Sequence, residues 1–328
     1  MANNIQFDLQ ELISERSVKK HGFIEIAQKV DGSMVRIPYF IICGKEEGPV
    51  LLVDACNHGD EYEGSEGIIQ VLNELSPEEV RGTLVGIPAL NLEAFNAGLR
   101  IAPIDWSYQD LNRAYPGNEN GLITSRIAHF YMHHFIRKAN YVISFHGGGN
   151  SLYLEPLAAY LPPDTEVGKV TYEMAKAFGV KVLWRQQNLP FSGITTVEAH
   201  KFGIPAIIPE IGGHCVRHEH RQYYVDICSN GIKNVMARFG MLQGEVPTVA
   251  DRIDVELRYL HTDQGGIHKP LRKALEECRE GDVLSEVHNL FGEKVGEVVA
   301  PFDGMIIGYW CYTTIHPGNW AFLYGKRV

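Results

Sequence analysis

The sequence predicts an α/β fold with a mostly parallel sheet flanked by helices, followed by a smaller β-rich domain. Two observations carry this prediction. Up to about residue 245, apolar strand-like runs alternate with segments of helical periodicity, which is typical of an α/β layer architecture. Beyond that point the helical periodicity fades, and short β-like pieces appear between Gly-Asp and Asp-Gly turns. We therefore expect residues 1–248 to form one domain and residues 249–328 a second, β-rich one.

The spacing of apolar residues predicts the elements of the first domain in order. Residues 22–30 and 34–43 flank Gly32 and predict a β-hairpin. Further strands are expected at 49–56, 83–88, 141–145, 180–184 and 204–209. Helices are expected at 64–75, 124–138, 166–178, 195–201 and 223–239. The polar stretch 91–121 has little periodicity and is expected to be a long loop, which in a compact domain is typically functional.

The second domain is expected to consist of short strands joined by turns. Strand-like pieces lie at 265–267, 281–284, 296–299, 304–309 and 320–324. A short segment at 271–278 has helical spacing. This pattern of short strands and turns predicts a small all-β module that contains one short segment of helical spacing.

Composition and charge restrict the classes of function. A hydrophobic content of 45% and a charged content of 21% are typical of a soluble globular protein. The net charge of −10 argues against a nucleic-acid role that rests on a basic surface. No apolar stretch approaches the roughly 18 residues of a membrane span, and the first residues lack the features of a signal peptide. The six cysteines include no CxxC pair and are expected to be reduced thiols, so the cytoplasm is the expected location.

Three residues with metal-binding side chains follow two strand-like runs. His58 and Glu61 come after the run 49–56, and His146 comes after the run 141–145. Zinc accepts both ligand types, and two histidines with one glutamate leave a fourth position for water. A structural, hydrogen-bonded histidine is the alternative for each one separately. Their joint placement at the carboxyl ends of strands favours a catalytic zinc site.

A third strand-like run leads to Glu210, which we expect on the same edge of the sheet. A carboxylate at a buried strand end is costly without a role or a partner. We expect Glu210 to act as general base and acid, and a structural ion pair with an arginine is the alternative. Arg100 and Arg113 lie in the long polar stretch. A guanidinium can bind a carboxylate or stabilise an oxyanion, whereas a solvated loop arginine is the alternative.

A second cluster of potential ligands follows Glu210 in the sequence. It contains His214, His218, Glu219 and His220. These side chains provide an alternative metal site. We prefer the interpretation that they form a polar rim of the active site, which sets the choice of substrate.

With these residues assembled, the chain resembles the succinylglutamate desuccinylase/aspartoacylase family. The matching motifs stand in the order of the family: Asn57-His58-Gly59-Asp60-Glu61, Asp110-Leu111-Asn112-Arg113 with Pro116-Gly117, Phe145-His146-Gly147-Gly148, and Glu210-Ile211-Gly212-Gly213. The tail segment Ala300-Pro301-Phe302-Asp303-Gly304 resembles the barrel module that closes these enzymes. The resemblance covers roughly residues 20–328 and implies a zinc carboxypeptidase-like mixed sheet with a C-terminal barrel.

The resemblance also implies roles for individual residues. It implies that His58, Glu61 and His146 bind Zn²⁺. It implies that Glu210 is the general base, that Arg100 polarises the scissile carbonyl, and that Asn112 and Arg113 hold a substrate carboxylate.

Two features depart from the family pattern. Ser144 stands where an acidic residue often precedes the histidine ligand by two positions, so another group must orient that imidazole. The tail lacks the lysine of true biotin or lipoyl carriers. The segments 185–192 and 214–220 match nothing in the family pattern, and we expect substrate choice to lie there.

The expected function is therefore that of a zinc-dependent amidohydrolase that removes a small acyl group, of the acetyl or succinyl type, from an N-acyl amino acid. Acetyl is preferred, because no second arginine is identified for the carboxylate of a dicarboxylic acyl chain. The expected partner is a small molecule, with no nucleic acid and no membrane, and the chain is a candidate homo-oligomer. The alternatives are a zinc carboxypeptidase that cleaves peptides and a non-catalytic metal- or metabolite-binding protein.

Overall fold

One long mixed sheet runs through most of the molecule. The structure is a computed structural model that describes residues 7–187, 192–214 and 219–328. The strands of this sheet have the order β1-β2-β4-β3-β5-β8-β6-β7-β9-β16-β14-β11. Their bounds are β1 (Val18–Gln28), β2 (Met34–Cys43), β3 (Val50–Asp54), β4 (Thr83–Ile87), β5 (Tyr141–Ser144), β6 (Leu152–Tyr160), β7 (Val182–Arg185), β8 (Ala206–Gly213), β9 (Ile253–His261), β11 (Glu277–Cys278), β14 (Gly304–Trp310) and β16 (Trp320–Arg327).

The sheet contains two parallel stretches, β4-β3-β5-β8 and β6-β7-β9, which are joined by the antiparallel pairing of β6 with β8. β3 pairs in parallel with β4 and β5, and β5 pairs in parallel with β8. The hairpin β1–β2 is antiparallel, as the sequence predicts, and so is the pairing of β6 with β8. The mixed α/β class is confirmed.

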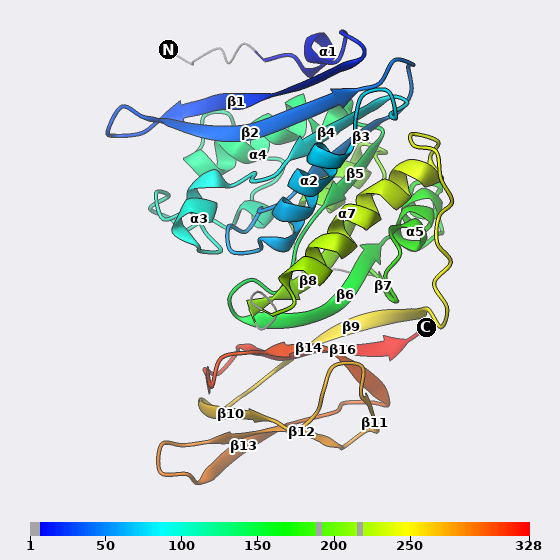
Figure 1. The fold of residues 1–328 in the computed structure, drawn as a ribbon. Coiled ribbons are helices and arrows are strands. Elements are labelled where there is room, and N and C mark those ends of the chain that lie inside the picture. Colours follow the sequence, from blue (N-terminus) through cyan, green and yellow to red (C-terminus); the bar gives the residue numbers. More distant parts are fainter. Residues whose placement is uncertain (1–6, 188–191, 215–218) are drawn as a thin grey trace.

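Helices cover both faces of the parallel stretch β4-β3-β5-β8 (Figure 1). They are α1 (Leu9–Leu12), α2 (Glu63–Glu74), α3 (Leu92–Ala97), α4 (Ile123–His134), α5 (Glu166–Phe178), α6 (Thr195–Lys201) and α7 (Arg221–Arg238), with 3-10 turns η1 (Leu111–Arg113) and η2 (Ile136–Lys138). Leu51 and Val53 share a core with α2, α5 and α7, whereas Val50 and Leu52 share one with α4 and α6. This alternation along β3 follows from the two-residue period of a strand.

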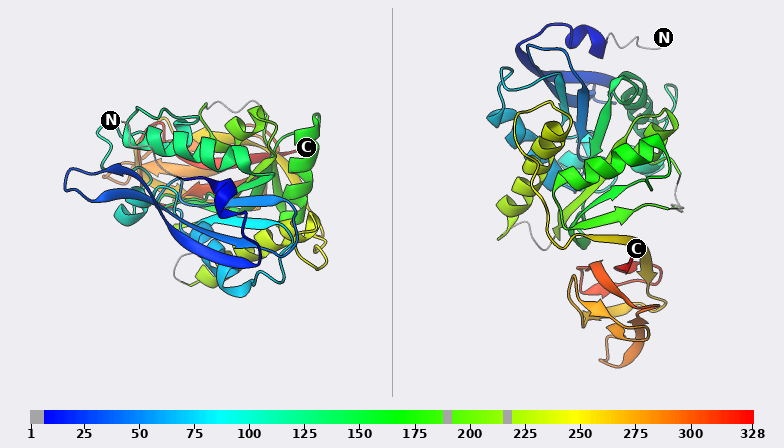
Figure 2. Two further views of the ribbon diagram at one scale, coloured as in Figure 1. Left: turned by 90° about the horizontal axis from the view of Figure 1, so that it is seen from above. Right: turned by 90° about the vertical axis from the view of Figure 1, so that its right-hand side faces the viewer.

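The C-terminal strands continue the main sheet and close a second core. β9 pairs in parallel with β7 and antiparallel with β16, so the chain passes from one part to the other within a sheet. A second sheet contains β10 (Gly266–Pro270), β12 (Val283–His288), β13 (Lys294–Val299) and β15 (Thr314–Ile315). This part includes a closed five-strand barrel and lies away from the helices (Figure 2). The boundary at 248/249 falls between α7 and β9 and stays a prediction.

Several expectations are wrong in detail. The segment 271–278 is not a helix but a turn that leads into β11. The expected loop at 91–121 contains α3 and η1. β6 and β9 were not expected. β8 extends to Gly213, so Glu210 lies within the strand and not beyond its end.

No helix among the described residues combines the length and the apolar character that a bilayer span requires.

Candidate functional site

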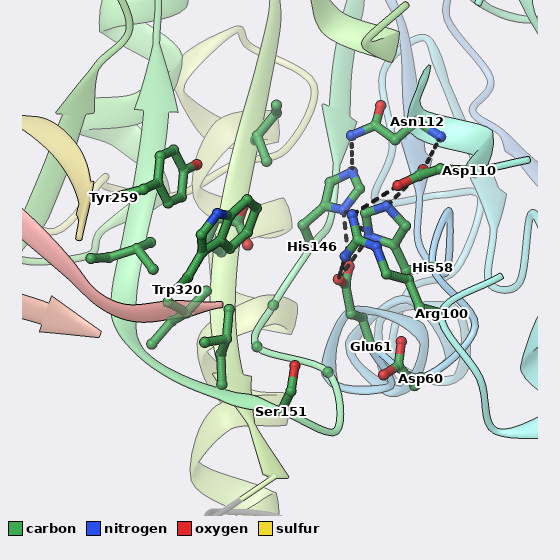
Figure 3. A pocket seen from close by; sticks show the side chains of 18 of the residues that line it. His58, Asp60, Glu61, Arg100, Asp110, Asn112, His146, Ser151, Tyr259 and Trp320 are labelled. Atoms are coloured by element: carbon green, nitrogen blue, oxygen red, sulfur yellow. Dashed lines mark hydrogen bonds and ion pairs between the residues drawn. The ribbon is translucent and has the colours of Figure 1, made fainter. Parts of the chain in front are cut away.

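Two histidines and a glutamate converge where the parallel strands end (Figure 3). His58 lies in the loop after β3, Glu61 lies just before α2, and His146 follows β5. All three are at least nine-tenths buried. Nδ1 of His58 lies 2.7 Å from Oε1 of Glu61, and Nδ1 of His146 lies 2.9 Å from Oε2 of Glu61. The two Nδ1 atoms are 3.2 Å apart.

This arrangement fits a metal ion. Two zinc ligands at about 2.0–2.1 Å and a tetrahedral angle lie roughly 3.3 Å from each other, close to the separation of the two Nδ1 atoms. Two imidazole nitrogens that face each other at such a distance are better satisfied by a shared cation than by each other. Among the described residues, this is the one group of three or more His, Cys, Asp or Glu whose ligand atoms are close enough to hold a metal. Its nitrogen and oxygen donors match those of zinc sites.

The charges of the cluster are set by mutual contact. Burial opposes ionisation of Glu61, but His58 and His146 outweigh it and hold its pKa well below the usual range. Burial also opposes the charging of His58, and here Glu61 and the hydrogen bond to Asp110 outweigh it and raise the pKa. The carboxylate is therefore ionised and ready to bind a cation.

Asp110 connects the cluster to a guanidinium. Its Oδ1 lies 3.1 Å from Nε2 of His58, and its Oδ2 accepts a hydrogen bond of 3.0 Å from Nη2 of Arg100. Nη1 of Arg100 lies 3.6 Å from Oε1 of Glu61. Although burial favours the neutral acid, His58 and Arg100 hold the pKa of Asp110 well below its usual range. The sequence pattern indicated no role for Asp110, although this residue begins the motif Asp110-Leu111-Asn112-Arg113.

Asn112 is buried and uses its amide inside the protein. Its Nδ2 lies 3.2 Å from Nε2 of His146, and its Oδ1 accepts hydrogen bonds from the backbone N–H and the hydroxyl of Thr195. The adjacent Arg113 donates from Nη1 to the carbonyl of Asn112 at 2.7 Å and lines the cavity described below. The 3-10 turn η1 therefore places Asn112 beside the imidazole of His146, and both Asn112 and Arg113 line the cavity.

Another buried carboxylate, that of Asp54, lies at the end of β3. Oδ1 of Asp54 accepts hydrogen bonds from the Ser144 hydroxyl at 2.9 Å and from Nδ2 of Asn57 at 2.8 Å, and Oδ2 accepts one from the Tyr131 hydroxyl at 2.7 Å. Burial outweighs these bonds and raises the pKa of Asp54 to about 6. Asp54 thus connects the strand before His58 to Ser144, two residues before His146. The sequence predicts a strand that contains Asp54 but indicates no functional role for this residue.

Glu210 lies next to His146 through backbone pairing. The His146 N–H donates to the carbonyl of Pro209 at 2.9 Å, and the Ile211 N–H donates to the carbonyl of His146 at 3.0 Å. Burial raises the pKa of Glu210 to about 8, although His146 and Arg100 act in the opposite direction. A carboxyl group with such a pKa can exchange a proton near neutral pH.

All seven predicted site residues line one cavity of about 450 Å³. They are His58, Glu61, Arg100, Asn112, Arg113, His146 and Glu210. The other side of the cavity is aromatic and was missed by sequence reasoning, because its members come from distant strands. Tyr259 and Trp320 face the metal-binding cluster across the cavity (Figure 3).

The alternative histidine cluster is only partly described. His214, Glu219 and His220 are exposed, and residues 215–218, including His218, lie outside the described residues. In the other segment expected to set substrate choice, residues 188–191 are likewise outside the described part, whereas Gln186 lines the cavity.

Comparison with known proteins gives a consistent picture. The family model of the succinylglutamate desuccinylase/aspartoacylase catalytic domain matches residues 47–238. The N-alpha-acetyl-L-2,4-diaminobutyric acid deacetylase of Halomonas elongata is 27% identical over 299 residues, which cover 88% of this chain and 85% of the deacetylase.

Solved structures agree over nearly the whole chain. The product-bound ectoine utilization protein EutE (DoeB) of Ruegeria pomeroyi superposes with a TM-score of 0.88 at 26% identity, over 95% of this chain and 96% of that one. A succinylglutamate desuccinylase of Silicibacter sp. also has a TM-score of 0.88 at 26% identity, over 96% of this chain and 97% of that one.

Proposed function

Because this chain belongs to the succinylglutamate desuccinylase/aspartoacylase family, we propose that it is a zinc-dependent amidohydrolase that removes a small acyl group, of the acetyl or succinyl type, from an N-acyl amino acid. One observation carries the proposal. A buried His-Glu-His cluster, a carboxyl group with a raised pKa and two guanidinium groups line the same cavity. The similar Halomonas deacetylase favours acetyl as the acyl group.

The proposed chemistry assigns a task to each polar side chain. His58, Glu61 and His146 would hold Zn²⁺, which when bound supplies a Lewis acid and lowers the pKa of a water molecule. Glu210 takes a proton from the attacking water and gives a proton to the leaving amine. This assignment suits its raised pKa, since an ordinary carboxylic acid is too strong to keep a proton near neutral pH.

The two arginines serve different parts of the substrate. Arg100 lies beside Glu61 and is proposed to stabilise the negative charge that develops on the carbonyl oxygen. Arg113 is proposed to hold the substrate carboxylate, since a guanidinium binds a carboxylate in bidentate fashion. Asn112 is proposed to assist it, since it lines the same cavity. Such binding orients the amide bond for attack.

We also propose the domain organisation, the class of partner and the cellular location of the protein. We place residues 1–248 in a zinc carboxypeptidase-like catalytic domain and residues 249–328 in a second domain. The net charge of −10 supports a small-molecule partner over nucleic acid, and we expect a cytoplasmic enzyme, with a homo-oligomer as a candidate state. Strands β9, β14 and β16 contribute to the wall of the cavity, which favours a small substrate over a peptide. Glu210 and Arg100 favour catalysis over mere metal binding.

A Glu210→Gln variant tests the proposal. It should keep one zinc ion per chain and lose about 10²–10⁴-fold in kcat, because proton transfer is lost while the ligands remain. Zinc content by elemental analysis and amine release from N-acetyl and N-succinyl amino acids are the two readouts. Glu245→Gln, at an exposed carboxylate outside the cavity, is the control. Full activity of Glu210→Gln would exclude this mechanism.

A further inference from the structure

The side of the cavity opposite the metal-binding cluster is built from aromatic rings. Trp184, Tyr259, Trp310 and Trp320 all line it, and we call these four residues the aromatic wall. Three of the four tryptophans of the chain are in this wall, whereas Trp106 is 79% exposed and lies outside the cavity. Most of the tryptophans of the chain are therefore concentrated at one cavity.

The aromatic wall is held in place by ordinary packing. The rings of Tyr259 and Trp320 are tilted by 32° to each other with centroids 4.4 Å apart, and Trp184 meets Tyr259 edge to face at 6.4 Å. Nε1 of Trp310 donates to the carbonyl of Thr314 at 2.8 Å. The rings pack together with a buried apolar cluster that includes Leu154 and other cavity-lining residues. The surface is therefore formed before a ligand arrives, which lowers the entropic cost of binding.

The charged groups of the cavity come from elsewhere in the chain. The C-terminal strands and turns contribute residues without charge, which are Tyr259, Trp310, Gly318, Asn319, Trp320 and Leu323. The charged lining residues all precede residue 211. A substrate that spans the cavity thus meets the metal-binding cluster at one end and aromatic rings at the other, where the Tyr259 hydroxyl is within electrostatic reach of Glu210 and Arg113.

The two arginines of the cavity disfavour an ammonium group of the substrate in their vicinity. Arg100 and Arg113 both line the cavity and would repel it. Three of the lining carboxylates already accept hydrogen bonds or pair with cationic groups: Asp60 with the Asn150 N–H, Glu61 with both histidines, and Asp110 with Arg100.

We propose that the aromatic wall is a specificity subsite for a bulky apolar group of the substrate. This assignment rests on the proposed hydrolysis of N-acyl amino acids and specifies the substrate further: where the acyl part bears the bulky group, it replaces the small acyl group of that proposal. The preferred substrate is an N-acyl amino acid with a single carboxylate and a ring or branched alkyl group, borne either by the amino acid or by the acyl part. A cavity of about 450 Å³ lies within the range of about 300–1,000 Å³ that is typical of pockets for drug-sized ligands.

The test is a substrate panel with the full-length, zinc-loaded enzyme, reading amine release. N-acetyl-L-phenylalanine places a ring on the amino acid, and N-benzoylglycine places it on the acyl group. N-acetylglycine has neither, and N-acetyl-L-aspartate and N-α-acetyl-L-2,4-diaminobutyrate carry charged side chains. We expect kcat/KM to be at least about tenfold higher for one of the ring-bearing compounds than for N-acetylglycine, since burying a ring is worth more than about 1.4 kcal/mol. Preference for N-acetyl-L-phenylalanine would show that the amino acid side chain contacts the aromatic wall. Preference for N-benzoylglycine would show that the acyl group contacts it.

Substitutions in the aromatic wall test whether these residues cause the preference for a ring-bearing substrate. Trp320→Ala should reduce the ratio of kcat/KM between the preferred ring-bearing compound and N-acetylglycine about tenfold, whereas Trp320→Phe should keep most of it. Trp106→Ala, a matched change outside the cavity, should leave the ratio unchanged. Circular dichroism establishes that each variant is folded, and the substrate ratio of the wild type tests the proposal without any variant.

Two different failures can be told apart. If the aspartate or diaminobutyrate derivative is hydrolysed best and Trp320→Ala leaves the ratios unchanged, the subsite assignment is overturned while the proposed function stands. If no N-acyl amino acid is hydrolysed, the proposed function fails and the subsite assignment fails with it.

Discussion

Burial acts in opposite directions on two carboxyl groups of the same cavity. Glu61 lies between two imidazoles, which hold its pKa well below the usual range despite its burial. Glu210 is partly buried, and desolvation raises its pKa to about 8, although His146 and Arg100 act in the opposite direction. Two carboxyl groups whose environments separate their pKa values are suited to different tasks, one as a permanent anion and one as a proton carrier.

The raised pKa of Glu210 leads to a pH prediction. A general base acts only when it is deprotonated, so kcat/KM should rise as the pH is raised through the pKa of Glu210. A bound dication lowers this pKa, and the midpoint for the zinc-loaded enzyme should therefore lie below 8. The measurement is a pH–rate profile on an N-acetyl amino acid. A profile with no loss of activity on the acid side would contradict the role of Glu210.

Asp54 gives a prediction for stability. Its pKa is raised from 3.8 to about 6 in the folded protein, so the folded state holds the proton more tightly than the unfolded state. The free energy of unfolding of the wild type should then fall, relative to Asp54→Asn, as the pH rises from about 4 to 6. The expected change is on the order of 3 kcal/mol, since one pKa unit corresponds to about 1.36 kcal/mol.

Urea unfolding of both proteins at several pH values measures this difference. The asparagine keeps a carbonyl for Asn57 and Ser144, and the Tyr131 hydroxyl can accept from its amide, so packing is largely preserved. A stability difference that stays constant across this pH range would show that Asp54 is ionised in the folded protein at all of these pH values.

At the scale of elements, the loop that carries His58 and Glu61 depends on a close backbone contact. A Cβ on Gly59 would lie 2.0 Å from the carbonyl carbon of Ala94 in α3. Gly59→Ala should therefore displace the loop and weaken zinc binding by about 10–100-fold, the range seen when the support of ligands is lost. Competition with a chelator measures this affinity.

Gly281→Ala is the control for this substitution. A Cβ there meets no heavy atom within 4 Å, but φ is +86°, so the change strains the backbone far from the site. It should lower stability and leave zinc affinity unaltered. Wild-type zinc affinity in Gly59→Ala would mean that the loop does not rely on its contact with α3.

Elements with strong local signals were predictable from the sequence. α5 spans Glu166–Phe178 as expected, because Thr165 caps its start and Gly179, in the left-handed conformation, ends it. The sequence also placed His58, Glu61 and His146 together, since residues that follow parallel strands meet at one sheet edge.

Elements decided by distant contacts were not predictable. β6 contains Pro156, which argues against a central strand, and the structure accommodates it where the register with β8 shifts between Leu154 and Leu157. Residues 271–278 have local helical spacing, but β11 pairs with β14 and the barrel overrides that preference.

At the scale of the whole molecule, the site is shared between two parts of the chain. The catalytic sheet supplies the charged and metal-binding residues, and the C-terminal strands supply uncharged residues, Tyr259 and Trp320 among them. The pairing of β9 with β7 joins these parts within one sheet (Figure 2). The aromatic side could not be predicted from the sequence, because neither tyrosine nor tryptophan carries a local signal of the cavity it faces. If the aromatic wall contacts the substrate as proposed, substrate choice depends on both parts of the chain.

The most direct test of the account is an anomalous-scattering map at the zinc absorption edge from crystals of the zinc-loaded protein. We predict one strong peak per chain, within ligand distance of Nδ1 of His58, Nδ1 of His146 and the carboxylate of Glu61. A peak at residues 214–220 instead, or no peak at the His58–Glu61–His146 cluster, would contradict the central claim.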